Sequence, residues 1–484
     1  MGSRKEIIMA DFMNALKKNL DENTFTLTEN GALAYTTTGS ALVDLNFSAC
    51  SYKEDLEKKF LKAYAENPEL AVKWLFYARD VRGGLGMRKL FRDLFMILPK
   101  EVQDKVIEYV PEYGRYDDLI YIYFHDYNKA FDIIKNQLME DLRNYSAGNS
   151  ISLLAKWMPS NNTSSAEARK QAKILAHELR LSDRDYRRML SKLRKYLRVT
   201  ERDMSANKWN EIKYEKVPAK AFMNYRNAFD KHDHDRFDEF VSTGKVKSSN
   251  IYPFEIFSKV KDSAKEDPVL EQIWKNLPDA DTGNTLVVAD GSGSMKWTNI
   301  FGSKATPWDV AHAMAFYFGE RAKGCFKNKY ITFSAIPELV SFDSNMTLNQ
   351  KVRLAKSYND CSNTDIVKTF NLILSTAVGN HLPAEDMPKN ILIISDMEFD
   401  ECGSIPPFEA IEKRFSLYGY ELPRLIFWNV GRNTKVPIQK NNNGITFVSG
   451  YSIAQCEAII HGEFDPYKNL VNILTSDRYS KIRL

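Results

Sequence analysis

The spacing of apolar residues predicts helices over most of the first 200 residues. In the segment 54–64, Leu56, Phe60, Leu61 and Tyr64 recur at intervals that place them on one helical face. The same spacing, interrupted by short connections, recurs in the segments 70–81, 89–98, 102–109, 117–123, 130–142, 164–178 and 182–197. No fixed repeat period relates these segments. The pattern therefore predicts an irregular, HEAT-like α-helical solenoid, which further helices continue over 203–262.

The pattern changes after residue 284. Short runs rich in β-branched residues now alternate with helical segments. The runs are 285–289, 330–333, 391–395, 425–430 and 445–449, and the helical segments are 308–321, 366–378 and 408–417. This alternation is typical of a doubly wound parallel α/β sheet. Because a polar turn cluster over 279–284 marks the change, we expect a helical domain over 1–280 and an α/β domain over 281–484.

Length and composition agree with two globular domains. The 484 residues are too many for one hydrophobic core, and 44% hydrophobic with 27% charged residues is ordinary globular composition. No apolar run reaches the roughly 18 residues that a membrane span needs. The five cysteines are scattered, which favours a reducing, cytoplasmic location. No signal peptide is expected, because the N-terminus lacks a long apolar segment.

Charge is concentrated in one part of the chain. The formal net charge is only +4, but residues 151–200 hold 12 basic and 4 acidic side chains. On a helix, Arg184, Arg188, Lys195 and Arg202 share one face, and an apolar face lies beside it. Such a cationic ridge would neutralise RNA phosphates, although a solvated surface helix is the alternative. The candidate RNA-binding residues here are Arg184, Arg187, Arg188, Arg194, Lys195, Arg198 and Arg202.

A glycine-rich turn adds a second basic group. Residues 83–86 read Gly-Gly-Leu-Gly between two predicted helices, and Arg82, Arg88 and Lys89 flank them. No strand precedes the turn and the P-loop pattern is absent, so it is not a nucleotide-binding loop. Its simplest role is a helix-to-helix turn. Alternatively, its backbone N–H groups and the three cations face a phosphate of RNA.

Oxygen-bearing side chains follow three elements of the predicted sheet. Asp290, Ser292 and Ser294 form a D-x-S-x-S motif after the first strand, Thr364 precedes the helical segment 366–378, and Asp396 follows the run 391–395. The carboxyl ends of parallel strands meet at one edge of a sheet. Carboxylate and hydroxyl oxygens suit Mg²⁺ or another hard divalent cation, so these five residues are the candidate metal ligands. The alternative is that Asp290 and Thr364 are helix caps and Asp396 is a turn residue.

These motifs resemble a known domain. Residues 284–484 look like a von Willebrand factor A domain with a metal-ion-dependent adhesion site (MIDAS). The resemblance implies that Ser292, Ser294 and Thr364 supply hydroxyl ligands, and that Asp290 and Asp396 hold the ion directly or through water. It also implies that a sixth position stays open to an acidic group of a partner protein.

The helical half carries a second resemblance. The segments 77–88 (YARDVRGGLGMR), 113–119 (YGRYDDL) and 156–159 (KWMP) resemble the TROVE module of Ro-type RNA-binding proteins. They resemble still more closely the Ro-like proteins of phages, plants and fungi. That resemblance implies a helical horseshoe that a von Willebrand A domain closes into a ring. It also implies a ribonucleoprotein that binds small or structured RNA.

Three functions are therefore open. The first is non-catalytic RNA binding by a Ro-like ring, and the second is a protein-interaction scaffold whose MIDAS metal captures a partner's carboxylate. The third is a metal-dependent hydrolase. The sequence holds no G-x-S-x-G, H-E-x-x-H or kinase signature. We therefore expect no enzyme, and no membrane partner.

Overall fold

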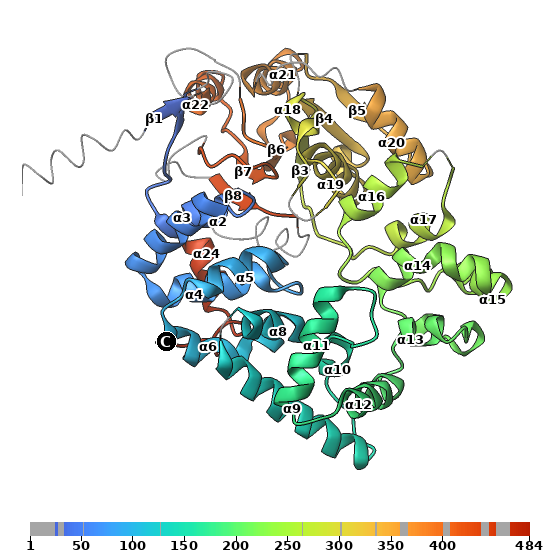
Figure 1. Cartoon of the computed structure of the whole chain (residues 1–484). Coiled ribbons are helices and arrows are strands. Elements are labelled where there is room, and N and C mark those ends of the chain that lie inside the picture. Colours follow the sequence, from blue (N-terminus) through green and yellow to red (C-terminus); the bar gives the residue numbers. More distant parts are fainter. Residues whose placement is uncertain are drawn as a thin grey trace, which may run out of the picture.

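The computed structural model combines an array of helices with a mixed α/β sheet. It describes residues 25–27, 33–51, 53–125, 127–263, 265–300, 303–333, 336–358, 366–399, 407–436, 445–451 and 465–484. Figure 1 shows the helices curving from α2 through α9 and α12 to α17, with the sheet between the two ends of the curve. The predicted fold class, a helical domain followed by an α/β domain, is confirmed.

The helical array consists mostly of short helices joined by short turns. Its elements as far as the middle of the array are α2 (Ala41–Phe47), α3 (Lys53–Glu66), α4 (Pro68–Arg79), α5 (Arg88–Met96), α6 (Lys100–Val106), α7 (Val110–Tyr113), α8 (Tyr116–Phe124) and α9 (Asn128–Ser146). The array continues with α10 (Leu154–Trp157), α11 (Ala166–Glu178), α12 (Asp183–Tyr196), α13 (Thr200–Ser205), α14 (Ala219–His232), α15 (His234–Ser242), α16 (Pro253–Lys261) and α17 (Pro268–Lys275). Two short antiparallel strands, β1 (Phe25–Leu27) and β2 (Leu33–Tyr35), precede it.

The basic helix α12 follows from its sequence at both ends. The Ser182 hydroxyl accepts a hydrogen bond from the Asp185 N–H at 3.1 Å, which caps the helix at its start. Tyr186, Leu190 and Leu193 are buried, as the apolar pattern predicts. The helix ends at Tyr196, because Arg198 adopts a left-handed conformation with φ 52°. The prediction of one helical ridge from Arg184 to Arg202 is therefore wrong, since Arg202 lies on the next helix, α13.

The sheet has six strands in the order β5-β4-β3-β6-β7-β8. They are β3 (Thr285–Asp290), β4 (Lys329–Phe333), β5 (Leu339–Ser341), β6 (Asn390–Ser395), β7 (Arg424–Asn429) and β8 (Ile445–Ser449). All neighbours are parallel except β4 and β5. Because the chain passes from β3 to β4 on one side and β6 lies on the other, the topology reverses between β3 and β6, where α/β sheets bind ligands.

Helices cover both faces of the sheet. They are α18 (Ser294–Trp297), α19 (Pro307–Arg321), α20 (Leu348–Ser357), α21 (Ile366–Gly379) and α22 (Pro407–Leu417). Every residue of β3 is buried, and successive side chains face opposite ways. Val287 and Ala289 belong to the hydrophobic cluster that includes α19, whereas Leu286 and Val288 belong to the cluster that includes α21.

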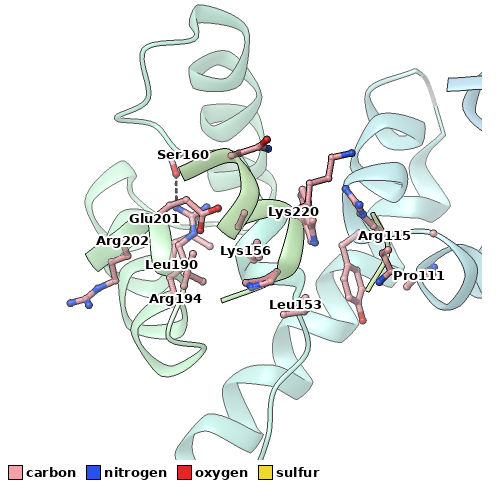
Figure 2. Close-up of a pocket in the computed structure, with 18 of the residues that line it drawn as sticks. Pro111, Arg115, Leu153, Lys156, Ser160, Leu190, Arg194, Glu201, Arg202 and Lys220 are labelled. Carbon is pink, nitrogen blue, oxygen red and sulfur yellow. Dashed lines mark hydrogen bonds between the residues drawn. The ribbon is translucent and has the colours of Figure 1, made fainter. Parts of the chain in front are cut away.

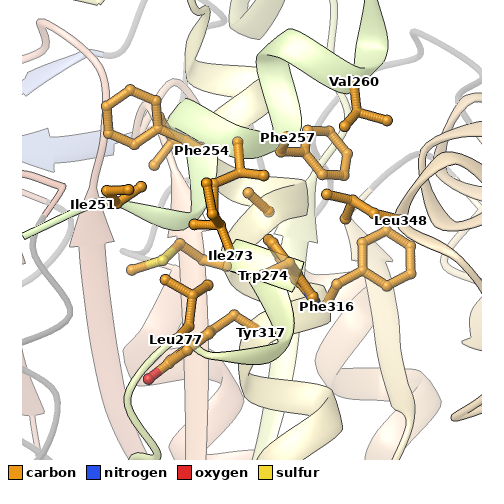
Figure 3. Close-up of a cluster of buried hydrophobic side chains, with 14 of the residues drawn as sticks. Ile251, Phe254, Phe257, Val260, Ile273, Trp274, Leu277, Phe316, Tyr317 and Leu348 are labelled. Carbon is orange, nitrogen blue, oxygen red and sulfur yellow. The ribbon is translucent and has the colours of Figure 1, made fainter. Parts of the chain in front are cut away.

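The helical array and the sheet share hydrophobic cores. Figure 3 shows Phe257 of α16 and Trp274 of α17 packed with Phe316 of α19. At the other end of the array, Phe47 of α2 contacts Phe447 of β8, with ring centroids 5.1 Å apart. Both ends of the curved array are thus attached to the sheet, and the chain forms a closed ring.

The last twenty residues return to the beginning of the array. Helix α24 (Pro466–Thr475) packs against α4. After it, the Arg478 guanidinium donates two hydrogen bonds to the Asp80 carboxylate, and the Tyr479 hydroxyl donates a third at 3.0 Å. The Tyr479 ring also stacks on Tyr113. Asp80 therefore joins segments about four hundred residues apart in the sequence.

No helix in the part of the chain that the structure describes is long and apolar enough to cross a membrane.

Candidate nucleic-acid interface and metal centre

The inner side of the ring contains a cavity of about 1390 Å³, called the central hollow below. Figure 2 shows that helices α10, α12, α13 and α14 and the start of α8 contribute side chains to it. Its basic lining residues are Arg82, Arg115, Lys156, Arg187, Arg188, Arg194, Arg202 and Lys220, and its acidic ones are Asp80, Glu112 and Glu201. The wall of the hollow is therefore predominantly cationic.

Two of the three acidic groups are neutralised by the C-terminal segment. Asp80 accepts hydrogen bonds from Arg478, and Glu112 forms an ion pair with Lys481 at 3.0 Å. By contrast, Arg82, Arg187 and Arg188 are exposed and have no ion-pair partner among the described residues. Arg202 and Lys220 in turn pair with Asp203 and Glu255, which do not line the hollow, so the hollow keeps the net positive charge that its lining side chains indicate.

Aromatic rings share the wall with the cations. Tyr113, Tyr116, Trp157, Tyr225 and Tyr252 all line the hollow. The Arg115 guanidinium lies 4.9 Å from the centre of the Trp157 ring, and the Lys156 ammonium lies 5.7 Å from it. Burial lowers the pKa of Arg115. Cations alternating with aromatic rings are typical of single-stranded nucleic-acid sites.

One cation of the wall is engaged by the protein. The Arg194 guanidinium donates to the Ala155 carbonyl at 2.8 Å, the Met158 carbonyl at 2.6 Å and the Ser160 hydroxyl at 2.6 Å, the last drawn in Figure 2. Burial lowers its pKa. Arg194 thus ties α12 to the end of α10, and it is positioned to shape the hollow more than to supply a free charge.

The structure divides the predicted basic residues into three groups. Arg82, Arg187, Arg188, Arg194 and Arg202 line the central hollow, and Arg88 and Lys89 line a smaller cavity beside it. Arg184, Lys195 and Arg198 are exposed but line neither cavity.

The Gly83–Gly86 turn is a helix-to-helix connection. The N–H groups of Gly84 and Gly86 both donate to the Asp80 carbonyl at 3.1 Å, and the Leu85 N–H donates to the Tyr77 carbonyl at 3.0 Å. A Cβ atom at Gly84 would lie only 1.9 Å from the Tyr77 carbonyl oxygen, so only glycine fits there. Because the N–H groups of residues 84–86 already have backbone partners, they do not cradle a phosphate, whereas the role of Arg82, Arg88 and Lys89 at a phosphate stays a prediction.

Sequence reasoning missed three cations of the hollow. Arg115 precedes α8, Lys156 belongs to α10 and Lys220 belongs to α14, so they are far apart in the sequence. Each stands alone and forms no basic run, which is why charge counting passed over them. A local signal existed for Lys156, because a cation next to a tryptophan is a common pair at nucleic-acid sites.

The predicted metal ligands gather at the carboxyl edge of β3 and β6. Asp290 is fully buried, and its two carboxylate oxygens accept hydrogen bonds from the Ser292 N–H at 2.9 Å and the Ser395 hydroxyl at 2.6 Å. The Ser292 and Ser294 hydroxyl oxygens lie 3.1 Å apart. Asp396 is 8% exposed. Thr364 lies outside the described residues.

The electrostatics of this edge suit a cation. Burial raises the pKa of Asp290 to about 7, and the negative charge of Asp396 adds to the effect. A divalent ion would remove this repulsion, and the oxygen donors present are those that Mg²⁺ prefers. No group of three or more His, Cys, Asp or Glu residues that would hold a metal exists in the described ranges. The predicted set relies on hydroxyls as well as two carboxylates.

The alternative roles, a helix cap for Asp290 and a turn residue for Asp396, differ in how well the structure supports them. Helix α18 begins after Gly293 without a side-chain cap, so Asp290 does not cap it. The Asp396 carboxylate accepts from the Glu398 N–H at 3.2 Å, as a turn residue does. This hydrogen bond is compatible with either role, because a carboxylate oxygen that accepts from an N–H keeps a second lone pair for a cation.

Two family models match the chain and meet at the start of β3. Residues 28–101 and 123–284 match DUF2828, and residues 284–474 match DUF7788; both are described as domains of unknown function. The chain is 28% identical over 507 residues to the uncharacterized protein L728 of Acanthamoeba polyphaga mimivirus, covering 92% of this chain and 86% of the viral protein. Among solved structures, it is similar to the Deinococcus radiodurans Ro (RSR) protein, with a TM-score of 0.44 and 14% identity, over 92% of this chain and all of that one.

Proposed function

We propose that this protein binds RNA without catalysis, and that single-stranded RNA enters the central hollow. The observation that carries the proposal is the lining of that cavity, which Arg82, Arg187 and Arg188, without ion-pair partners among the described residues, share with aromatic rings. Arg187 and Arg188 would neutralise phosphates, and Trp157 and Tyr225 would stack on bases. The resemblance of the segments 77–88, 113–119 and 156–159 to the TROVE module agrees with this function.

Cavity size favours a polymer over a small metabolite. Sites for small molecules typically have volumes of about 300–1000 Å³. The hollow exceeds this range at about 1390 Å³, and several separate cations surround it. A strand with a phosphate on every nucleotide would use these cations together, whereas a small ligand would meet only a few of them. Small or structured RNAs with single-stranded ends are therefore the ligands that we propose.

Helix α12 supplies a variant and a matched control for the test. Arg187 and Arg188 line the hollow, whereas Arg184 and Lys195 on the same helix do not. The variant R187E/R188E and the control R184E/K195E change the net charge equally. Only the first should abolish most binding to a single-stranded RNA and make the slope of log K against log salt shallower, by about 0.7 per lost phosphate contact. Equal losses in the two variants would mean that RNA binds the outer surface.

Sequence preference should be weak in this assay. Contacts to phosphates position an RNA but carry no sequence information. R187E/R188E should therefore weaken binding to oligonucleotides of different sequence by similar factors. A loss confined to one sequence would point to base recognition at these two arginines.

A second function is favoured by the carboxylates at the sheet edge. We propose that Mg²⁺ is held by Asp290, Ser292, Ser294, Thr364 and Asp396. The ion would supply a positive charge able to bind an acidic side chain of a partner protein. The two proposals are compatible, because the metal edge and the hollow use different residues. If partner binding in the presence of Mg²⁺ survives in the variant S292A/S294A, the metal is not the partner's contact point.

A further inference from the structure

A second cavity, of about 510 Å³, opens beside the central hollow. The two cavities share five lining residues, Val81, Gly86, Arg115, Lys220 and Tyr252. The smaller one lies between α5, the segment before α16 and the loop after α18, and it is called the side chamber below. Its volume falls within the range of about 300–1000 Å³ that is typical of sites for single small ligands.

The walls of the side chamber differ in character. One wall is aromatic: the Tyr252 and Phe254 rings are stacked with centroids 5.8 Å apart, and Tyr451 meets Phe254 edge-on at 5.5 Å. Met87, Leu90 and Leu94 add an apolar surface. This side suits a flat, weakly polar group such as a nucleobase, which gains stacking and burial there.

The other wall is cationic. Arg88, Lys89, Arg115 and Lys220 line it, against Asp93 and Glu255. The Arg88 side chain is 51% exposed and the Lys220 side chain 54% exposed, so both are accessible although Asp117 and Glu255 pair with them. Arg115 and Lys220 belong to both cavities and thus stand where the chamber meets the hollow. Cations at this junction suit a phosphate that leads from one cavity into the other.

A polar group in the apolar part points to a ligand as well. Ser51 lines the chamber and is 4% exposed, and its hydroxyl has no hydrogen-bond partner within the described part of the chain. Buried hydroxyls are normally hydrogen-bonded, so the Ser51 hydroxyl suits a polar group of a ligand in the chamber.

We infer that the side chamber binds one nucleotide, with its base against the Tyr252–Phe254–Tyr451 wall and its phosphate at Arg115 and Lys220. This rests on the proposed function in one respect, because a strand lying in the hollow would present its terminal nucleotide to the chamber. A free nucleoside monophosphate has the same chemistry and is the second source. A strand end is preferred here because the chamber opens off a hollow large enough for a strand.

A substitution at Ser303 would fill the side chamber without changing the lining of the central hollow. It lines only the side chamber, is half-buried, and accepts a hydrogen bond from the Ala305 N–H at 3.1 Å. S303F would fill the chamber, and S303A loses the same hydrogen bond but leaves the space open. The pair therefore separates filling of the cavity from loss of the hydroxyl, and thermal unfolding of both variants is the check that they fold.

The experiment compares a linear single-stranded oligonucleotide with a circle of the same sequence, which has no ends, and uses AMP as the free mononucleotide. Wild type and S303A should bind the linear form on the order of 10-fold more tightly than the circle, since one stacked base is gained. S303F should bind both forms with the affinity of the circle. AMP that binds wild type but not S303F would show that the chamber also takes the free mononucleotide.

Three results separate the two proposals. Equal affinity for linear and circular RNA in wild type, with no AMP binding, overturns the chamber and leaves RNA binding intact. AMP binding lost in S303F, with neither RNA bound, supports the chamber and overturns RNA binding in the hollow. A preference for linear RNA that persists in S303F places the strand end elsewhere and overturns the chamber.

Discussion

The hollow and the sheet edge differ in the exposure of their like-charged side chains. In the hollow, Arg82, Arg187 and Arg188 are exposed, so water stabilises their like charges. At the sheet edge, Asp290 and Asp396 are buried together, and repulsion adds to burial in raising the pKa of Asp290. Exposed like charges attract a polyanion at little cost to folding, whereas buried like charges lower stability until a counter-ion binds. Salt concentration should therefore change the affinity of the hollow for RNA, whereas pH and metal should change the stability of the sheet.

The largest predicted effect concerns the pH dependence of stability on the sheet side, without metal. The pKa of Asp290 is raised to about 7, so the folded state binds more protons than the unfolded state between pH 4 and 7, and stability falls with rising pH. Burial lowers the pKa of His312 to about 4, so the unfolded state binds more protons between pH 4 and 6.5, and stability rises with pH. The two trends oppose each other in the wild type.

Single variants should reveal each trend in urea unfolding with a chelator present. Of the two groups, only His312 titrates in D290N, so this variant should gain about 3 kcal/mol of stability between pH 4 and 6.5. Only Asp290 titrates in H312Q, so that variant should lose about 4 kcal/mol between pH 4 and 7. Parallel pH profiles for wild type and both variants would show that the sheet does not bury these groups as described.

Loss of Arg194 should destabilise the wall of the hollow. Its guanidinium has three protein acceptors, and R194A would leave the Ala155 and Met158 carbonyls without this donor. The free energy of unfolding, measured by chemical denaturation, should fall by about 2–3 kcal/mol. R188A, which removes an exposed guanidinium from the same helix, should change stability by less than about 0.5 kcal/mol. Similar losses would mean that the two arginines have equivalent roles, against the hydrogen bonds seen here.

Magnesium should stabilise the wild type by an amount similar to the loss in R194A. Binding only to the folded state adds about 2.7 kcal/mol when the ion is present at 100 times its Kd. D290A and S292A should remove this stabilisation, whereas R187E/R188E should keep it, because the hollow lies apart from the sheet edge. A metal response unchanged in D290A would exclude the site.

The sequence predicts the architecture well because the fold depends on local periodicity. The helical spacing of Leu56, Phe60 and Tyr64 predicts α3, and the apolar run 285–289 predicts β3. Both predictions succeed because each pattern lies within one element. The sequence also predicts that Asp290 and Asp396 lie at the same edge of the sheet, and they do, because β3 and β6 are adjacent parallel strands. Short-range patterns and sheet topology carry this information.

The hollow could not be predicted in the same way. Arg115, Lys156 and Lys220 meet only because the array curves, and curvature is the sum of many small packing angles between helices. The helical wheel for α12 also failed beyond Tyr196, since the left-handed Arg198 redirects the chain and places Arg202 on α13. Neither feature leaves a periodic signal in the sequence.

Crosslinking tests the central claim, that RNA lies in the hollow, most directly. A single-stranded RNA carrying photoreactive bases, irradiated with wild-type protein and mapped by mass spectrometry, should crosslink to Trp157 and Tyr225. R187E/R188E should lose these crosslinks, and R184E/K195E should keep them. Crosslinks confined to exposed residues that do not line the hollow, such as Arg180 in the turn after α11 or Lys195 on α12, would contradict the proposal.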